Sequence, residues 1–157
     1  MGFFDRFSTD IGIDLGTCNT LIYVRGKGIV IDEPSVVAVE KGTKRILAVG
    51  SEAKNMLEKT PSNIIAIRPL ADGVISDIDS CERMIKYFIQ KITPKHQIIK
   101  STRMKIGIPS CVTDVERRAV IEAALKAGAK EVEVIEESKA AAIGAKSPIF
   151  EPAGHMI

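Results

Sequence analysis

The stretch IGIDLGTCNTLIYV, residues 11–24, decides the fold. Apolar residues occupy every second position from residue 11 to residue 15, which is the period of a strand that buries one face. The tight segment 16–19 then leads into a second apolar run at 20–24. Parallel strands cannot be joined by so short a connection, so the stretch predicts an antiparallel hairpin.

Downstream of this hairpin the chain first adds a third strand and then a small insert. Gly26 and Gly28 mark a turn before an apolar strand at 29–31. Pro61 disfavours helix in the residue before it and so closes the helix of the insert. The insert spans residues 34–66, with predicted strands at 36–39 and 46–49 and a helix at 51–59, and an extended run follows at 64–67.

Helices alternate with strands in the rest of the chain. Apolar residues at helical spacing between 84 and 92 predict an amphipathic helix, which Asp77 or Asp79 can cap. Thr113 and Glu116 match a capping box, and Gly128 is the expected left-handed stop after Ala127. The other predicted elements are strands at 104–108 and 131–135 and an alanine-rich helix at 139–145.

The resulting order is βββ, an insert, then αβαβα. Consecutive strands favour an antiparallel meander, whereas strands separated by helices require parallel crossovers. We therefore predict an α/β fold with a mixed sheet and helices on its faces.

Composition narrows the class of protein. The 157 residues suit one domain or part of a larger one. The 22 basic and 20 acidic residues are scattered, which argues against nucleic acid as a partner. Cys18, Cys81 and Cys111 are far apart and are expected to be free thiols. Without a signal peptide or an apolar run of about 20 residues, the expected location is the cytoplasm.

The hairpin turn is the first candidate site. Asp14 ends a strand and is followed by Gly16 and small polar residues. Exposed backbone amides in such a turn can cradle phosphates, and Asp14 could hold Mg²⁺ through its water shell. The alternative is an ordinary hairpin, in which Thr17 and Asn19 only stabilise the turn.

Two further segments carry candidate chemistry. Glu136 or Glu137, at the end of a strand, could orient water toward a γ-phosphate, or could simply favour the start of the next helix. At the N-terminus, residues 1–8 would place Phe3, Phe4 and Phe7 along one apolar edge if helical. That edge suits a membrane interface, and the alternative is a segment that frays or packs on its own domain.

Several longer stretches resemble the MreB family of bacterial actins, in the family's order along essentially the whole chain. Residues 13–23 resemble the family's first phosphate motif, of which Asp-Leu-Gly-Thr alone is shared with sugar kinases and heat-shock chaperone ATPases. The other matching stretches are 26–30, 33–38, 66–70, 72–75, 113–119, 135–137 and 140–145.

This resemblance implies the first lobe of an actin-like (ribonuclease H-like) ATPase fold. Residues 9–33 and 67–157 would form an incomplete subdomain IA, and residues 34–66 the small subdomain IB. The implied function is an ATP-dependent cytoskeletal filament, with weak ATPase activity, that organises cell-wall synthesis and rod shape at the inner face of the cell membrane. The implied partners are further copies of the chain, the membrane surface and membrane proteins of the wall machinery.

The resemblance also implies roles for individual residues. Thr17, Cys18 and Asn19, with Gly16 in the same turn, would contact the phosphates of ATP. Asp14 would lie near Mg²⁺, and Glu137 would position the hydrolytic water. The alternatives are an actin-fold ATPase of the chaperone or sugar kinase type, or an inactive lobe.

Three departures from the family pattern bear on these expectations. Cys18 stands where the family often has Ala, and Ser138-Lys139 replaces the usual Pro-Met. Lys139 can pair with Glu136 or Glu137 and so weaken hydrolysis. Residues 151–157 resemble the approach to the family's second phosphate motif. We therefore expect weak nucleotide affinity and little activity for this chain without a second lobe.

Overall fold

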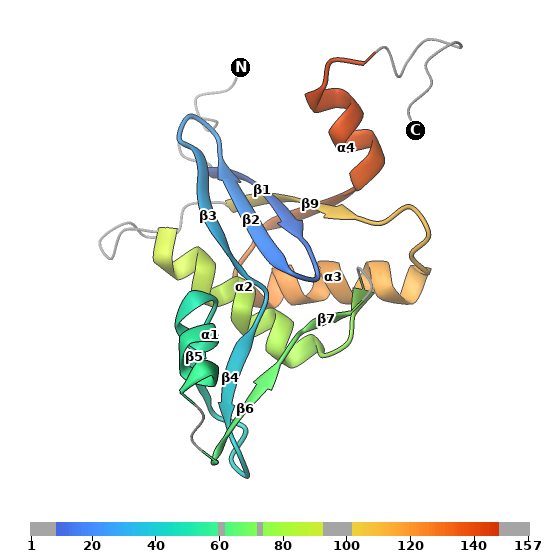
Figure 1. Ribbon diagram of the computed structural model, residues 1–157. Helices are drawn as coiled ribbons and strands as arrows, with labels where there is room; N and C mark the ends of the chain where they lie inside the picture. Colours follow the sequence, from blue (N-terminus) through green and yellow to red (C-terminus); the bar gives the residue numbers. More distant parts are fainter. Residues whose placement is uncertain (1–8, 60–61, 72–73, 93–101, 148–157) are drawn as a thin grey trace.

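The predicted hairpin lies in the main sheet of the computed structural model, which describes residues 9–59, 62–71, 74–92 and 102–147 (Figure 1). Strands β1 and β2 pair antiparallel, as do β2 and β3, whereas β1, β9 and β10 run parallel, so the predicted mixed sheet is confirmed. The strand order is β10-β9-β1-β2-β3. These strands are β1 (Thr9–Leu15), β2 (Asn19–Val24), β3 (Gly28–Pro34), β9 (Thr102–Ile108) and β10 (Glu131–Glu136).

The insert forms a separate three-stranded antiparallel sheet in the order β5-β4-β6. Its elements are β4 (Val37–Glu40), β5 (Ile46–Val49), α1 (Ser51–Glu58) and β6 (Ile64–Ile67). A small core of its own contains Val36, Ala38, Ala48 and Ala53. Strand β4 begins and ends one residue later than the strand predicted at 36–39. Ile67 pairs with Val37, so this sheet extends one residue past the predicted insert.

The helices start and stop where local chemistry directs them. Helix α2 (Ile78–Ile92) is capped by Asp77, whose Oδ1 accepts from Ser80 N at 2.9 Å, which decides between the two candidate caps. Helix α3 (Asp114–Ala127) has the predicted capping box, and Gly128 follows it with a φ of 114°. The short helix α4 (Glu137–Gly144) begins directly at the end of β10.

A two-stranded hairpin, β7 (Leu70–Ala71) and β8 (Val74–Ile75), precedes α2. The sequence pattern predicted no strands here, because two-residue strands leave no periodic pattern.

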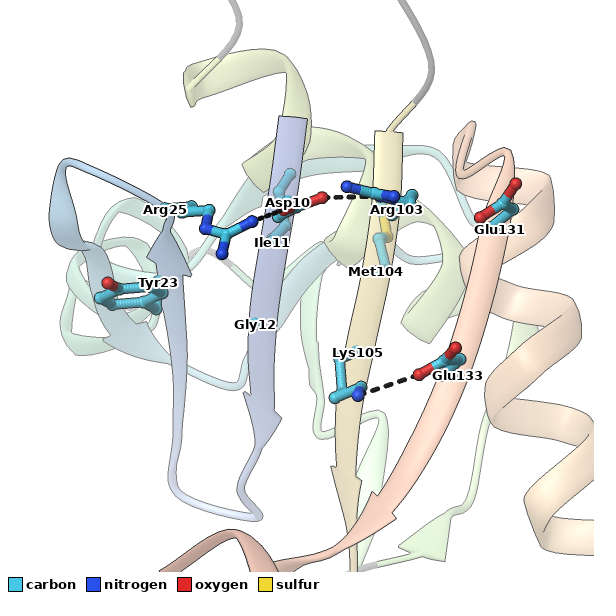
Figure 2. Close-up of a pocket in the computed structure, with 10 residues that line it drawn as sticks. All are labelled: Asp10, Ile11, Gly12, Tyr23, Arg25, Arg103, Met104, Lys105, Glu131 and Glu133. Carbon is cyan, nitrogen blue, oxygen red and sulfur yellow. Dashed lines mark hydrogen bonds and ion pairs between the residues drawn. The ribbon is translucent and has the colours of Figure 1, made fainter. Parts of the chain in front are cut away.

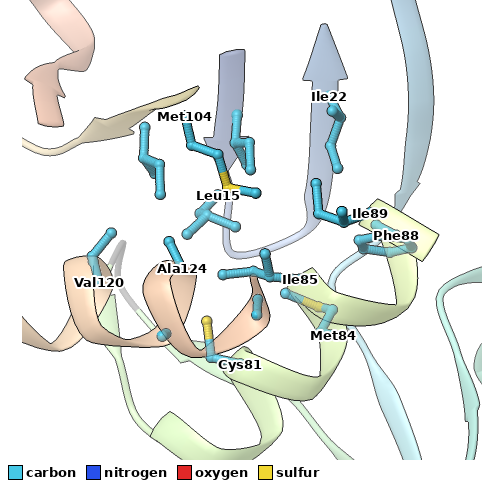
Figure 3. Close-up of a cluster of buried hydrophobic side chains, with 14 of the residues drawn as sticks. Leu15, Ile22, Cys81, Met84, Ile85, Phe88, Ile89, Met104, Val120 and Ala124 are labelled. Atoms are coloured by element: carbon cyan, nitrogen blue, oxygen red, sulfur yellow. The ribbon is translucent and has the colours of Figure 1, made fainter. Parts of the chain in front are cut away.

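The core lies between one face of the main sheet and helices α2 and α3 (Figure 3). The sheet contributes Leu15, Ile22 and Met104, and α2 presents Phe88, which is fully buried. Alanines such as Ala124 let α3 approach closely. Each large apolar side chain buried here stabilises the fold by about 1.5–3 kcal/mol.

Cys81 lies in this core. Burial, together with the charge of Asp77, raises the pKa of its thiol to about 12, so it stays protonated and behaves as a small apolar group at neutral pH. All three cysteines are free, as expected.

The opposite face of the main sheet is open over much of its area. Along β1 the side chains alternate, so Ile13 and Leu15 enter the core while Gly12 and Asp14 lie on the open face. Two apolar side chains of this sheet, Tyr23 and Ile29, are 49% and 64% exposed. Helix α4 lies on the side of the sheet opposite α2 and α3 (Figure 1).

Candidate functional site

Two of the sequence-predicted acidic residues meet at the carboxyl edge of the main sheet. Because β1, β9 and β10 are parallel, their ends coincide there. Asp14 pairs with Gly107, which in turn pairs with Ile135. Glu137 follows two residues after Ile135 as the first residue of α4. The register therefore brings Asp14 and Glu137 together from positions more than one hundred residues apart.

Gly107 is a residue of this site that the sequence did not single out. A Cβ atom at position 107 would lie 3.3 Å from Cγ of Glu137 and 3.7 Å from the carbonyl oxygen of Ile13. The missing side chain therefore leaves room for Glu137 to lie across β9 toward Asp14. The only signal in the sequence is a glycine within an otherwise apolar strand, which often marks a close approach.

The carboxyl of Glu137 is electrostatically perturbed. Partial desolvation first, and the negative charge of Asp14 second, raise its pKa above the ordinary value of 4.5. Both side chains remain exposed. Two facing carboxylates with access to solvent can orient a water molecule or share a hydrated cation between them.

Glu136 has a different role. Its Oε1 accepts a hydrogen bond from Nζ of Lys139 at 2.8 Å. Lys139 therefore pairs with Glu136 and not with Glu137, the other glutamate that the sequence offered. Glu136 is the N-cap residue of α4, but its side chain makes no capping hydrogen bond. Nearby, the hydroxyls of Ser110 and Ser138 lie 3.1 Å apart and link the loop after β9 to α4.

The β1–β2 turn is tight enough to require glycine at its first position. A Cβ atom on Gly16 would lie 2.5 Å from the carbonyl oxygen of Asn19. The Asn19 side chain donates to Oδ1 of Asp32 at 3.0 Å, so it holds β3, and a phosphate would meet the backbone of Asn19 instead. Cys18 is exposed and Thr17 is half-buried.

A buried serine braces this turn from below, and the sequence did not reveal it. Ser35 Oγ donates to the carbonyl oxygen of Gly16 at 2.6 Å, and the backbone N–H of Ser35 donates to the carbonyl oxygen of Cys18 at 2.8 Å. The hydroxyl of Thr20 lies 2.9 Å from Ser35 Oγ. Ser35 and Thr20 are both fully buried. Nothing in the local pattern shows that residue 35 lies under residue 16.

A hollow of about 520 Å³ lies elsewhere on the open face, over the first halves of β1, β9 and β10 and the end of the antiparallel strand β2 (Figure 2). Most of its charged groups are paired with one another: Asp10 binds Arg25 and Arg103, each at 2.8 Å, and Lys105 binds Glu133 at 2.9 Å. The hydrogen bond from Arg103 is the main reason that the pKa of Asp10 is lowered. Because each of its three basic side chains is already paired with a carboxylate, the hollow is a weaker candidate for a phosphate site than the turn.

The residues at the sheet edge suit a nucleotide with its magnesium ion. Mg²⁺ usually keeps several waters and needs only one or two carboxylates besides phosphate oxygens, which Asp14 and Glu137 can supply. Within the described ranges, no group of three or more His, Cys, Asp or Glu residues is placed to hold a metal directly.

Membrane contact was predicted for Phe3, Phe4 and Phe7, which lie outside the described residues. Among the helices of the described part of the chain, none is long and apolar enough to cross a membrane.

A family model, curated sequences and solved structures all match this chain and name related proteins. The family model described as MreB/Mbl protein matches residues 8–157. The cell shape-determining protein Mbl of Bacillus subtilis is 54% identical over 151 residues, which cover 96% of this chain and 45% of that protein. The chain therefore spans about half the length of the curated relatives it matches.

Solved structures agree with this result. MreB5 of Spiroplasma citri bound to ADP superposes with a TM-score of 0.82 at 37% identity, covering 94% of this chain and 44% of that one. A MamK double helical filament has a TM-score of 0.76 over 88% of this chain and 44% of the MamK chain. At 23% identity, the MamK match shows a shared fold alone.

Proposed function

The chain belongs to the MreB/Mbl protein family, and from this premise we propose that it forms the nucleotide-binding first lobe of an ATP-dependent, actin-like filament protein. The observation that carries the proposal is the meeting of the β1–β2 turn, Asp14 and Glu137 at one edge of the main sheet. A turn with exposed amides beside two neighbouring carboxylates can supply phosphate contacts, a place for Mg²⁺ and a group that orients water, which are recurring parts of an ATPase site.

In this proposal the backbone of Gly16, Thr17, Cys18 and Asn19 surrounds the phosphates of ATP. Glycine at position 16 lets the turn fold tightly, and successive N–H groups can make an anion-binding concavity. Asp14 holds the hydrated magnesium ion. When bound there, Mg²⁺ would neutralise part of the charge on the phosphates.

Glu137 orients the water that attacks the γ-phosphate. Its raised pKa makes the carboxyl a better proton acceptor than an ordinary glutamate, while an open path to solvent supplies the water. The Lys139 ammonium is held by Glu136, which supports a functional Glu137 despite the nearby positive charge. We propose slow ATP hydrolysis, because positioning a single water with one carboxylate is a modest catalytic device.

The names of the relatives support the wider role. Mbl is a cell shape-determining protein, and MreB5 has been solved with ADP. MamK, which shares the fold, has been solved as a double helical filament. We propose that this chain likewise acts within a self-assembling polymer at the inner face of the cell membrane, with membrane proteins of the wall machinery as partners. Phe3, Phe4 and Phe7 supply the apolar edge that would touch the membrane.

The test is a titration of the isotope-labelled chain with Mg-ATP, followed by NMR. We expect weak binding, with a dissociation constant of roughly 0.1–1 mM, because the matched relatives are about twice as long and a second lobe would supply further contacts. Peak shifts should map to residues 16–19 and to Glu137, and Asp14→Ala should abolish them.

Glu133→Ala is the matched control, since it removes an exposed carboxylate from the same open face within the separate hollow. It should leave binding unchanged. Shifts that map to the hollow, or a folded chain whose turn does not respond to Mg-ATP, would overturn the proposed site.

A further inference from the structure

Ser35 occupies the junction between the two sheets. It follows Pro34, the last residue of β3, and lies two residues before Val37, the first residue of β4. The neighbouring residue Val36 accepts a hydrogen bond from Gly50 N at 2.9 Å, which ties this junction to the small sheet. The root of the small sheet and the β1–β2 turn are therefore parts of one hydrogen-bonded unit.

The direction of the hydrogen bonds through Ser35 is determined by simple counting. A serine hydroxyl has one hydrogen, and the Gly16 carbonyl can only accept, so Ser35 Oγ must donate to Gly16 at 2.6 Å. The same oxygen can then only accept from the Thr20 hydroxyl, 2.9 Å away. The result is a buried relay in which Thr20 donates to Ser35 and Ser35 donates to the turn.

Ser35 thereby orients two peptide groups of the turn. Its hydroxyl binds the carbonyl of Gly16 and its N–H binds the carbonyl of Cys18. In a planar trans peptide the N–H points opposite to the C=O. Drawing both carbonyls toward Ser35 therefore aims the amides of Thr17 and Asn19 away from it.

We propose that Ser35 is the positioning residue of the phosphate-binding turn: it sets the orientation of the Thr17 and Asn19 amides and so the affinity for the phosphates of ATP. This inference rests on the proposed function. It adds that the affinity is set from the root of the small sheet, through a side chain that touches no ligand.

The experiment compares four variants of the chain. Ser35→Ala removes the whole relay, Thr20→Val removes its first donor, and Thr20→Ser keeps that donor. Ile11→Val is the matched control, because it trims a buried side chain on the same hairpin away from the turn. For each variant, ¹⁵N relaxation reports the rigidity of the turn amides, and the Mg-ATP titration reports affinity.

The wild-type turn should be rigid, with order parameters of about 0.85, and Ser35→Ala should lower them toward about 0.6. Loss of the hydroxyl leaves the Gly16 carbonyl and the Thr20 hydroxyl without their partner, so Mg-ATP affinity should fall about tenfold. Thr20→Val should have a smaller effect on both quantities. Thr20→Ser and Ile11→Val should match the wild type.

A merely structural serine would lower the stability of the fold and leave order parameters and affinity unchanged. That outcome, or equal effects from Ser35→Ala and Ile11→Val, overturns the inference while leaving the proposed site intact. A wild-type turn that does not respond to Mg-ATP overturns the proposed function, and this inference with it.

Discussion

Replacing Gly16 with alanine should damage both the hairpin and the site, whereas the same change at Gly12 on the same strand should not. A Cβ atom on Gly16 would lie 2.5 Å from the Asn19 carbonyl oxygen, about 0.5 Å closer than Cβ atoms ever approach such a group. The backbone must move, yet the Gly16 carbonyl is held by Ser35 at 2.6 Å. We expect an overpacking cost of roughly 1–3 kcal/mol.

At Gly12 the new Cβ would meet only Tyr23 Cβ at 3.8 Å, an ordinary van der Waals contact. Alanine there should be neutral or stabilising by about 0.5–1 kcal/mol, because glycine loses more chain entropy on folding. In a chain of this size 1 kcal/mol corresponds to roughly 2–4 °C in the melting temperature. Gly16→Ala should therefore lower it by about 2–12 °C.

Thermal unfolding followed by circular dichroism measures both variants, with Mg-ATP titration as the second readout. Gly16→Ala should also lose binding, and Gly12→Ala should keep it. A Gly16→Ala variant with the melting temperature of the wild type would refute the steric argument, and so would equal falls in melting temperature for Gly16→Ala and Gly12→Ala.

Three further predictions concern the carboxylates and the junction between the sheets. Asp14→Asn should lower the pKa of Glu137 but not restore it to 4.5, because desolvation, the larger cause of the rise, remains. NMR titration of the Glu137 side-chain carboxyl measures this pKa. An unchanged pKa would contradict the electrostatic interaction between Asp14 and Glu137. Gly107→Ala should displace Glu137 by a few tenths of an ångström, since the new Cβ would lie 3.3 Å from its Cγ. It should therefore weaken ATP hydrolysis more than ATP binding, measured as a fall in kcat greater than the rise in KM; equal changes would count against a positioned water. Burial alone would raise the pKa of Glu33, but hydrogen bonds from the Lys91 ammonium and the Ser51 amide lower it below 4.5. The ionised carboxylate therefore stabilises the fold above pH 4.5, and this contribution is lost as the pH falls through the lowered pKa. Glu33→Gln should therefore cost about 1–2 kcal/mol at pH 7 in urea unfolding, with a deficit that shrinks as the pH falls below 4.5; a deficit independent of pH would exclude the ionic explanation.

The elements that the sequence predicted well are those whose causes lie within a few residues. The hairpin at 11–24, the capping box of α3 and the left-handed Gly128 all depend on neighbours in the chain, and the structure confirms each. Boundaries moved by one to three residues, because the last residues of a strand depend on a partner: β3 was predicted at 29–31 and extends to Pro34, where β2 pairs with it. Strand β4 runs over Val37–Glu40, where β5 and β6 pair with it, and not over 36–39.

The candidate site was foreseen only in part. The motif drew attention to Asp14, to the turn after it and to Glu137, and the structure brings the two carboxylates close enough for one charge to shift the other's pKa. The sequence could not show that Lys139 pairs with Glu136 and not with Glu137, because both glutamates are close enough to Lys139 along the chain.

The sequence by itself therefore determined the alternation of the longer elements, the hairpin, both ends of α3 and the membership of the chain in a family. Only the tertiary structure decided that Gly107 makes room for Glu137 and that Ser35 holds the turn through Gly16. The physical reason is distance along the chain. Local conformation follows from the preferences of adjacent residues, whereas a steric gap or a buried hydrogen bond between distant residues exists only once strand register has brought them together.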